Sequence, residues 1–182
     1  MKVYSYVVKH DTGFAPNPSG AYCTLACCKP TIRKGAQEGD WVIGTGSKTT
    51  VGQDRLVFTM KITKKLSFEE YGRDKIFSRR RDSIFYEEDG HLKQKKVFRH
   101  DQKGIKHDLE GKYVLISDRG NYSYFGKNAI SIPERFQKVI KRGPGHKCKF
   151  DEDFARTFVR WLEDNCKKGI CGEPYVKEPE TC

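Results

Sequence analysis

The stretch Gly39-Asp-Trp-Val-Ile-Gly-Thr-Gly-Ser47, together with Leu56-Val-Phe-Thr-Met-Lys-Ile62, decides the fold class that this chain can adopt. Residues 38–40 are predicted to form a turn, and the apolar run that follows ends in glycines. The second stretch alternates apolar and polar residues, which is typical of a half-buried strand. We therefore predict a β-hairpin with a glycine-containing connection at residues 46–52.

Further strands and helices are predicted on both sides of this hairpin. Strand-like runs occupy residues 3–8, 83–86, 95–99 and 113–117. A capping box at Ser67-Phe-Glu-Glu70 predicts a short helix over residues 68–73, and prolines can open helical turns at residues 30 and 133. An apolar stripe at residues 154, 158, 161 and 162 predicts a longer helix over residues 151–167.

Strands and helices that do not alternate regularly indicate an α+β fold rather than a parallel α/β fold. We expect a curved antiparallel or mixed sheet, or a small open β-barrel, with a few short helices and a longer C-terminal helix. The length of 182 residues fits one domain, which we place at residues 1–170. Residues 171–182, which are rich in proline and charge, are expected to form a flexible tail.

The charge balance points to partners that carry phosphate. Lysine and arginine number 35 against 24 aspartate and glutamate residues, a formal net charge of +11. Such a charge attracts nucleic acids and nucleotides, although a basic surface can also serve solubility alone. The predicted partners are nucleic acid or nucleotide, with proteins of a base-modification system as a further expectation.

The chain contains no apolar run of the roughly 20 residues that a membrane-spanning helix needs. Its first nine residues alternate and do not resemble a signal peptide, so we expect a cytoplasmic protein that does not contact a membrane. The seven cysteines are then expected to be reduced. Their spacings, Cys23-x3-Cys27-Cys28 and Cys166-x4-Cys171, do not match common zinc sites, so neither a metal nor another cofactor is predicted.

Candidate ligand-binding residues gather in the N-terminal third. Gly44 and Gly46 permit close backbone approach, and Ser47 and Lys48 add a hydroxyl and a cation that suit a phosphate or a base. The alternative is a strand end with a glycine bulge. Two further elements are a proline loop with Asn17, whose amide can bind a base edge, and a basic helical step with Lys29 and Arg33. A rigid connector with solvated cations explains both elements equally well.

Two other groups could contact nucleic acid. Arg79, Arg80 and Arg81 form an arginine run that suits phosphate, although such runs are commonly solvated loops. Tyr122 and Tyr124 could stack on a base, although alternating aromatic residues on a strand usually face the core on one side.

Catalytic candidates are few. His107 next to Asp108 could serve acid–base chemistry, with Asp40 or His146 as alternatives, and Cys23 could act as a nucleophile. No complete catalytic set is found, so the sequence leaves open whether the protein is an enzyme.

Four of these segments resemble a known bacterial and phage family: Phe14-Ala-Pro-Asn-Pro18, residues 23–33, residues 39–47 and Tyr124-Phe-Gly126. The family is the nucleotide-modification-associated domain of the second type. The resemblance implies an association with systems that modify nucleotides or DNA bases. The Gly39-Asp40 step also resembles the PUA, ASCH and EVE folds, which are small β-barrels that bind RNA or modified bases.

Together these observations favour a binding module over two alternatives. A base or nucleotide would lie in a pocket lined by Asn17, Trp41, Gly44, Ser47 and Tyr124, with Lys29, Arg33 and residues 79–81 on phosphates. The first alternative is an enzyme acting on nucleotides or modified bases. The second is a protein-interaction subunit of a modification or phage-defence system.

Overall fold

The computed structural model describes residues 1–95 and 102–176. A seven-stranded mixed sheet forms its centre, with β1 parallel to β4 and β10 parallel to β13. The other pairs in this sheet are antiparallel. Its order is β12 (His146–Lys147), β1 (Val3–Val7), β4 (Trp41–Thr45), β5 (Arg55–Lys61), β10 (Tyr122–Tyr124) and β13 (Gly169–Ile170), and β11 (Ile130–Ser131) also pairs with β5.

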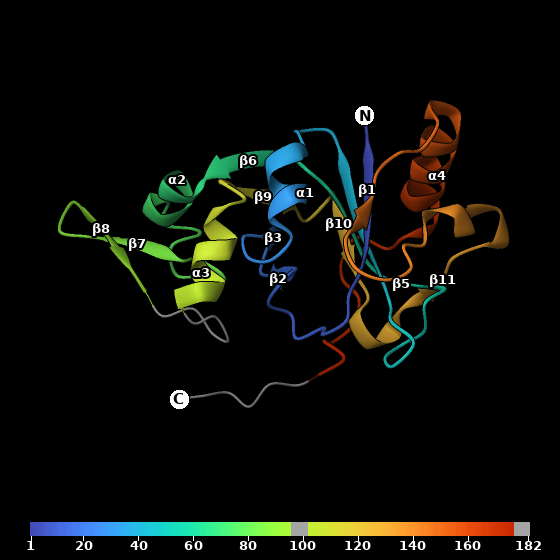
Figure 1. Cartoon of the computed structure of the whole chain (residues 1–182), viewed down its shortest axis with the longest axis horizontal. Helices are drawn as coiled ribbons and strands as arrows, with labels where there is room; N and C mark the ends of the chain where they lie inside the picture. Colours follow the sequence, from blue (N-terminus) through green and yellow to red (C-terminus); the bar gives the residue numbers. More distant parts are fainter. Residues whose placement is uncertain (96–101, 177–182) are drawn as a thin grey trace.

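A second, antiparallel sheet lies beside the first. Its order is β2 (Asn17–Ser19), β3 (Tyr22–Leu25), β9 (Tyr113–Asp118) and β6 (Lys64–Ser67). A separate hairpin of β7 (Phe85–Glu88) and β8 (His91–Gln94) extends from the far side of this sheet (Figure 1).

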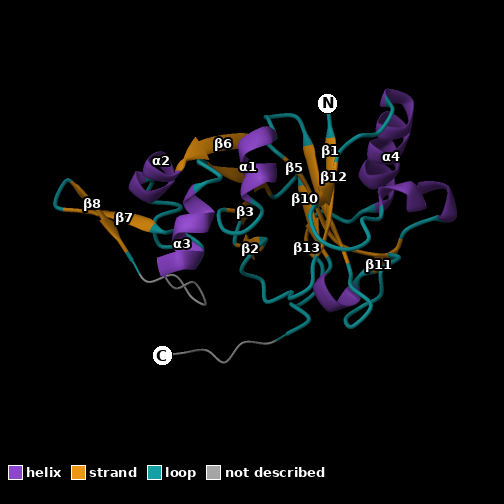
Figure 2. Cartoon of the chain, in the orientation of Figure 1, coloured by secondary structure: helices purple, strands orange, loops and turns teal. Residues whose placement is uncertain are grey.

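The α-helices are α1 (Pro30–Gly35), α2 (Phe68–Arg73), α3 (Gln102–Leu109) and α4 (Glu152–Asn165), and the 3-10 helices are η1 (Gly126–Asn128) and η2 (Glu134–Val139). Helix α4 covers one face of the large sheet, α2 and α3 pack against the second sheet, and α1 lies between the two sheets (Figure 2). The described strands do not close into a barrel, so of the two expected arrangements the mixed sheet is found. The predicted α+β class is confirmed.

Strand alternation divides the apolar residues of the large sheet between two cores. Trp41 and Ile43 face α4, whereas Val42 faces the second sheet. A third core lies between the second sheet, α2 and α3 and contains Tyr71 and Ile105. The large sheet is therefore buried on both faces and provides a rigid base for the loops at its ends.

Local signals explain most helix starts. The Ser67 hydroxyl accepts from the Glu70 amide, which completes the predicted capping box, and the Asp151 side chain accepts from the Phe154 amide at the start of α4. The predicted hairpin is present as β4 and β5. The strand expected at residues 83–86 begins at Phe85 instead, and most of the strand expected at residues 95–99 lies outside the described residues.

The described part of the expected tail is bound to the domain. The amide of Val176 donates to the Asp11 carbonyl at 2.9 Å, and the amide of Lys127 donates to the Glu173 carbonyl at 2.9 Å. The amide of Tyr175 donates to the Asp11 carboxylate at 3.3 Å. Residues 171–176 thus follow β13 along the end of the large sheet, a placement that proline and charge content did not indicate.

Three hydroxyls on the α4 face of the large sheet are buried without a hydrogen-bond partner among the described residues: Ser5, Thr59 and Ser123. Ser123 lies opposite Thr59, and Ile43 lies between Thr59 and Ser5. The three hydroxyls therefore form one row across the sheet.

No helix in the described part of the chain has the length and apolar character needed to cross a membrane.

Candidate functional site

One cavity of about 460 Å³ combines several of the predicted ligand residues. We call it the lysine pocket, because three amines and no carboxylate are found among the described residues that line it. Its walls are Val7, Lys9, Lys29, Ser47, Lys48, Thr49, Gln53, Gly143, Pro144 and Gly145. Three positive charges without a negative neighbour in the lining favour an anionic ligand.

The lysine pocket lies at the carboxyl ends of two parallel strands. β1 ends at Val7 and β4 ends at Thr45, and the two strands are in register at these residues. The loops that leave these ends therefore bring Lys9 and Lys48 to the same edge of the sheet. The Val8 amide donates to the Thr45 carbonyl at 2.8 Å, which continues the pairing into the pocket rim.

Hydrogen bonds between its own residues hold the loop from Ser47 to Gln53 together. The Ser47 hydroxyl lies 3.1 Å from the hydroxyls of both Thr49 and Thr50. A Cβ on Gly46 would lie 2.2 Å from the Gly52 carbonyl oxygen, so only glycine allows the two ends of the loop to approach this closely. The predicted need for glycine at position 46 therefore has a packing cause beside the pocket.

Lys29 provides the most enclosed amine of the pocket. Its backbone has φ of 47° and follows Cys28, which has φ of 60°, so two consecutive non-glycine residues adopt the left-handed region. The Lys29 Nζ lies 4.6 Å from the centroid of the Tyr6 ring, a cation–π distance. Burial lowers the pKa of Lys29 from its ordinary value. Left-handed backbone at such residues is costly and is concentrated at functional sites.

His146 lies on β12, opposite Tyr6 of β1. Its ring centroid is 5.9 Å from that of Tyr4. Burial, and then the positive charge of Lys29, lowers the pKa of His146. The imidazole is therefore neutral near pH 7, and it gains charge only under more acidic conditions.

The model of one protein family, described as nucleotide modification associated domain 2, matches residues 1–180. The chain belongs to this family. The comparisons found no matching curated protein and no matching solved structure. The family name associates the chain with nucleotide modification.

Arg33 of this nucleotide modification associated domain lies in the interior and not in the lysine pocket. Its side chain has no exposed surface, and its Nε and two Nη atoms donate to the carbonyls of Cys28, Tyr113 and Asp108 at 2.7, 2.8 and 2.5 Å. The Asp108 carboxylate lies 3.7 Å from Nη2 and accepts from the Cys28 amide. Arg33 thus joins α1, β9 and α3, and its placement gives no support to contact with a ligand.

Four other predicted pocket residues lie within the cores. Trp41 is buried on the α4 face, and a Cβ on Gly44 would lie 2.2 Å from the Phe58 ring. The Tyr124 hydroxyl donates to the Asp11 carboxylate at 2.5 Å, and Asn17 is buried in β2. Of the residues predicted to hold a ligand, the structure brings Lys29, Ser47 and Lys48 together in the lysine pocket.

The three predicted phosphate-binding arginines lie apart from the lysine pocket and differ in environment. Arg80 donates to the carbonyls of Ser19, Asn17 and Tyr22 at 2.9, 2.6 and 3.3 Å, so it fastens the β2–β3 hairpin. Arg79 lines a different cavity, with Ser78, Tyr86, Glu87 and Lys95, and Arg81 is exposed.

The predicted catalytic residues do not converge. Cys23 is fully buried, and burial raises the pKa of its thiol far above the ordinary value, which disfavours the thiolate. His107 is exposed on α3, where it lies 3.2 Å from Glu110, whereas its neighbour Asp108 is buried. Asp40 accepts from two backbone amides, those of Lys2 at 2.7 Å and Gln37 at 3.0 Å.

No group of three potential metal ligands is found in residues 1–95 and 102–176. The cysteines of these ranges are free.

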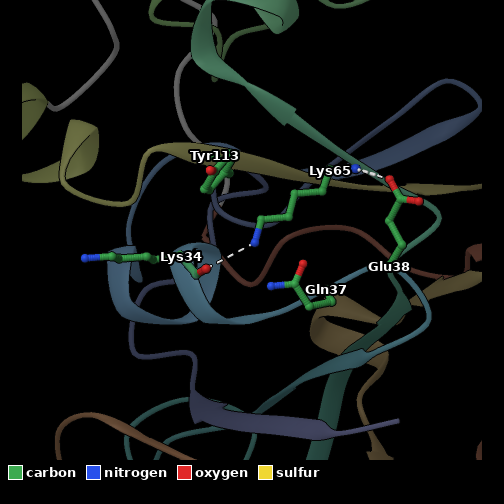
Figure 3. A pocket seen from close by; sticks show the side chains of 5 residues that line it. All are labelled: Lys34, Gln37, Glu38, Lys65 and Tyr113. Atoms are coloured by element: carbon green, nitrogen blue, oxygen red, sulfur yellow. Dashed lines mark hydrogen bonds between the residues drawn. The ribbon is translucent and has the colours of Figure 1, made fainter.

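A second cavity, shown in Figure 3, has a volume of about 490 Å³ and carries mixed charge. Its central amine, from Lys65, points at the end of α1 and donates to the carbonyls of Lys34 and Ala36 at 3.1 and 2.6 Å. The same amine lies 4.4 Å from the Tyr113 ring centroid, and Glu38 adds a carboxylate to the lining. Because this amine already stabilises the carboxyl end of α1, we regard the lysine pocket as the better candidate site.

Sequence reasoning missed several walls of the lysine pocket. Lys9 and residues 143–145 belong to none of the motifs that the sequence analysis singles out, yet they line the pocket. Lys9 closely follows β1, so a basic residue after a strand end is a signal that could have found it. Residues 143–145 reach the pocket through the pairing of β12 with β1, and these two strands are more than 100 residues apart in the sequence.

Proposed function

We propose that this domain binds the phosphate of a nucleotide or nucleic acid in the lysine pocket. The observation that carries the proposal is the convergence of Lys9, Lys29 and Lys48 on one cavity. Hydroxyls of Ser47 and Thr49 and the amide of Gln53 add neutral donors around the same space. Amines and hydroxyls in this combination suit phosphate oxygens, which accept several hydrogen bonds at once.

The pocket recognises the phosphate rather than the base. No aromatic side chain is among the described residues of its lining, so base stacking does not contribute there. The volume is within the usual range for small-ligand sites. The association of the family with nucleotide modification supports a nucleotide unit over other phosphate compounds.

Isothermal titration with thymidine and its mono-, di- and triphosphates tests this proposal. We expect the phosphates to bind, thymidine itself to give no signal, and affinity to fall with added salt. Lys29→Met should weaken binding about tenfold or more, because a hydrogen bond to a charged group contributes about 1.5–3 kcal/mol. Lys106→Met, a matched loss of charge on the exposed face of α3, should bind like the original protein.

Equal affinity for thymidine and its phosphates would contradict the proposal. Equal losses in the Lys29 and Lys106 variants would also contradict it, because they would indicate an effect of net charge alone.

A further inference from the structure

One wall of the lysine pocket, formed by residues 143–145, belongs to a strongly basic segment. Residues 141–149 read Lys-Arg-Gly-Pro-Gly-His-Lys-Cys-Lys and contain no acidic residue. Gly143, Pro144 and Gly145 line the pocket, so basic residues precede and follow the stretch that a ligand would contact. Positive charge therefore continues beyond the cavity on both sides of this wall.

The position of this segment at a sheet edge keeps it accessible. Its strand β12 has two residues and is the outermost strand of the large sheet, next to β1. Arg142 and Lys149 are exposed at either end. We call residues 141–149 the basic edge.

Internal contacts hold the middle of the basic edge in place. The Lys147 amine donates to the Lys138 carbonyl at 2.6 Å and lies 5.6 Å from the centroid of the Phe150 ring. His146 is fixed opposite Tyr6 by strand pairing. The exposed cations near the two ends therefore belong to a segment whose middle is fixed relative to the pocket.

A free nucleotide leaves most of this charge unused. Its phosphates fill the cavity between Lys9, Lys29 and Lys48, whereas Arg142 and Lys149 lie on the exposed edge outside the residues that line it. A polymer with regularly repeated phosphates uses both parts, because one phosphate can enter the pocket while its neighbours contact the edge.

We propose that the ligand is a single-stranded nucleic acid, with one phosphate in the lysine pocket and the adjacent phosphates along the basic edge. This inference rests on the proposed function. A single strand can turn its backbone into a concave pocket, whereas a duplex is stiff over about 50 nm and presents its phosphates on a convex surface. Contacts to phosphate carry no information on base identity, so this binding is tolerant of base sequence.

Fluorescence anisotropy with labelled oligothymidylates of about 4, 8 and 16 nucleotides tests the inference, since single-strand sites span this range. Oligouridylates and a duplex of the longest length complete the set and distinguish DNA from RNA and single strands from duplexes. Affinity should rise with length and exceed that of thymidine triphosphate, which serves as the competitor. The duplex should bind more weakly than the single strand.

The double variant Arg142→Gln/Lys149→Gln separates the edge from the pocket. It should weaken binding of the longer oligonucleotides and reduce the slope of log affinity against log salt by about 1.4, since each single-strand phosphate contact contributes about 0.7. Its affinity for thymidine triphosphate should be unchanged. Lys103→Gln/Lys106→Gln on α3 provides the control with the same change in charge.

Each failure has a distinct meaning. If thymidine triphosphate binds but length adds no affinity, if the duplex binds more tightly, or if the edge variant behaves like its control, the inference is wrong and the proposed function stands. If neither the triphosphate nor any oligonucleotide binds, both are wrong.

Discussion

Lys29 and Arg33 are four residues apart, yet they belong to regions with opposite character. The Lys29 amine faces a solvent-accessible cavity together with two other amines. The Arg33 guanidinium is enclosed by three backbone carbonyls and the Asp108 carboxylate. Similar charge and a shared helical step therefore do not indicate a shared role, because the partners on neighbouring elements decide which cation is left to bind a ligand.

The largest test of this comparison removes the interior cation. Arg33→Met should lower the free energy of unfolding by about 3–5 kcal/mol, because it leaves the buried Asp108 carboxylate without its ionic partner. Urea denaturation followed by circular dichroism measures the change. Lys29→Met should alter the unfolding free energy far less. Similar losses for the two variants would remove the distinction between the regions.

The second test uses pH to separate the pocket amine from ordinary lysines. Burial lowers the pKa of Lys29, so its charge is present at low pH and is lost before that of exposed lysines as pH rises. Nucleotide affinity should therefore fall by about tenfold or more as the pH rises, and this fall should begin below about pH 10.4, where ordinary lysines lose their charge. Titrations across alkaline pH measure this fall. The control variant Lys29→Arg should show no such early fall. An equally early fall in that variant would assign the change to another group.

A third test concerns the loop that carries Ser47 and Lys48. Gly46→Ala places a methyl group against the Gly52 carbonyl, so we expect a loss of about 1–3 kcal/mol in unfolding free energy and weaker nucleotide binding. Gly35→Ala is a suitable control, because a Cβ there would lie 3.6 Å from the Tyr4 hydroxyl, an ordinary contact. Thermal unfolding and titration of both variants provide the measurement. Unchanged binding in Gly46→Ala would show that the loop does not shape the pocket.

The smallest expected effect concerns buried polar groups that lack partners. The Thr59 hydroxyl is buried without a hydrogen-bond partner among the described residues, whereas Arg33 has several partners. Thr59→Val should therefore be neutral or stabilise the protein by up to about 1 kcal/mol. Urea denaturation checks this value, with Thr24→Val as the contrast because the Thr24 hydroxyl donates to Asp82 at 2.6 Å. A clear loss in Thr59→Val would reveal a partner for this hydroxyl.

Sequence patterns predicted the local elements well and the site only in part. Capping residues, glycines and strand alternation act over a few positions, so the hairpin of β4 and β5, the start of α2 and the start of α4 could be recognised. The parallel pairing of β1 with β4 and the placement of residues 143–145 depend on contacts between distant segments. Burial of Arg33 depends on Asp108 and Tyr113, which lie 75 and 80 positions further along the chain.

The contact between Asp11 and Tyr175 also constrains the order in which the protein can form. The two residues are separated by 164 positions, and β13 joins the large sheet only at residues 169–170. During synthesis, β1, β4 and β5 can pair early, but the edge of the sheet beside β10 stays open until residues 169–170 have left the ribosome. A nascent chain that stalls before that point exposes an unpaired strand edge, a surface that promotes aggregation.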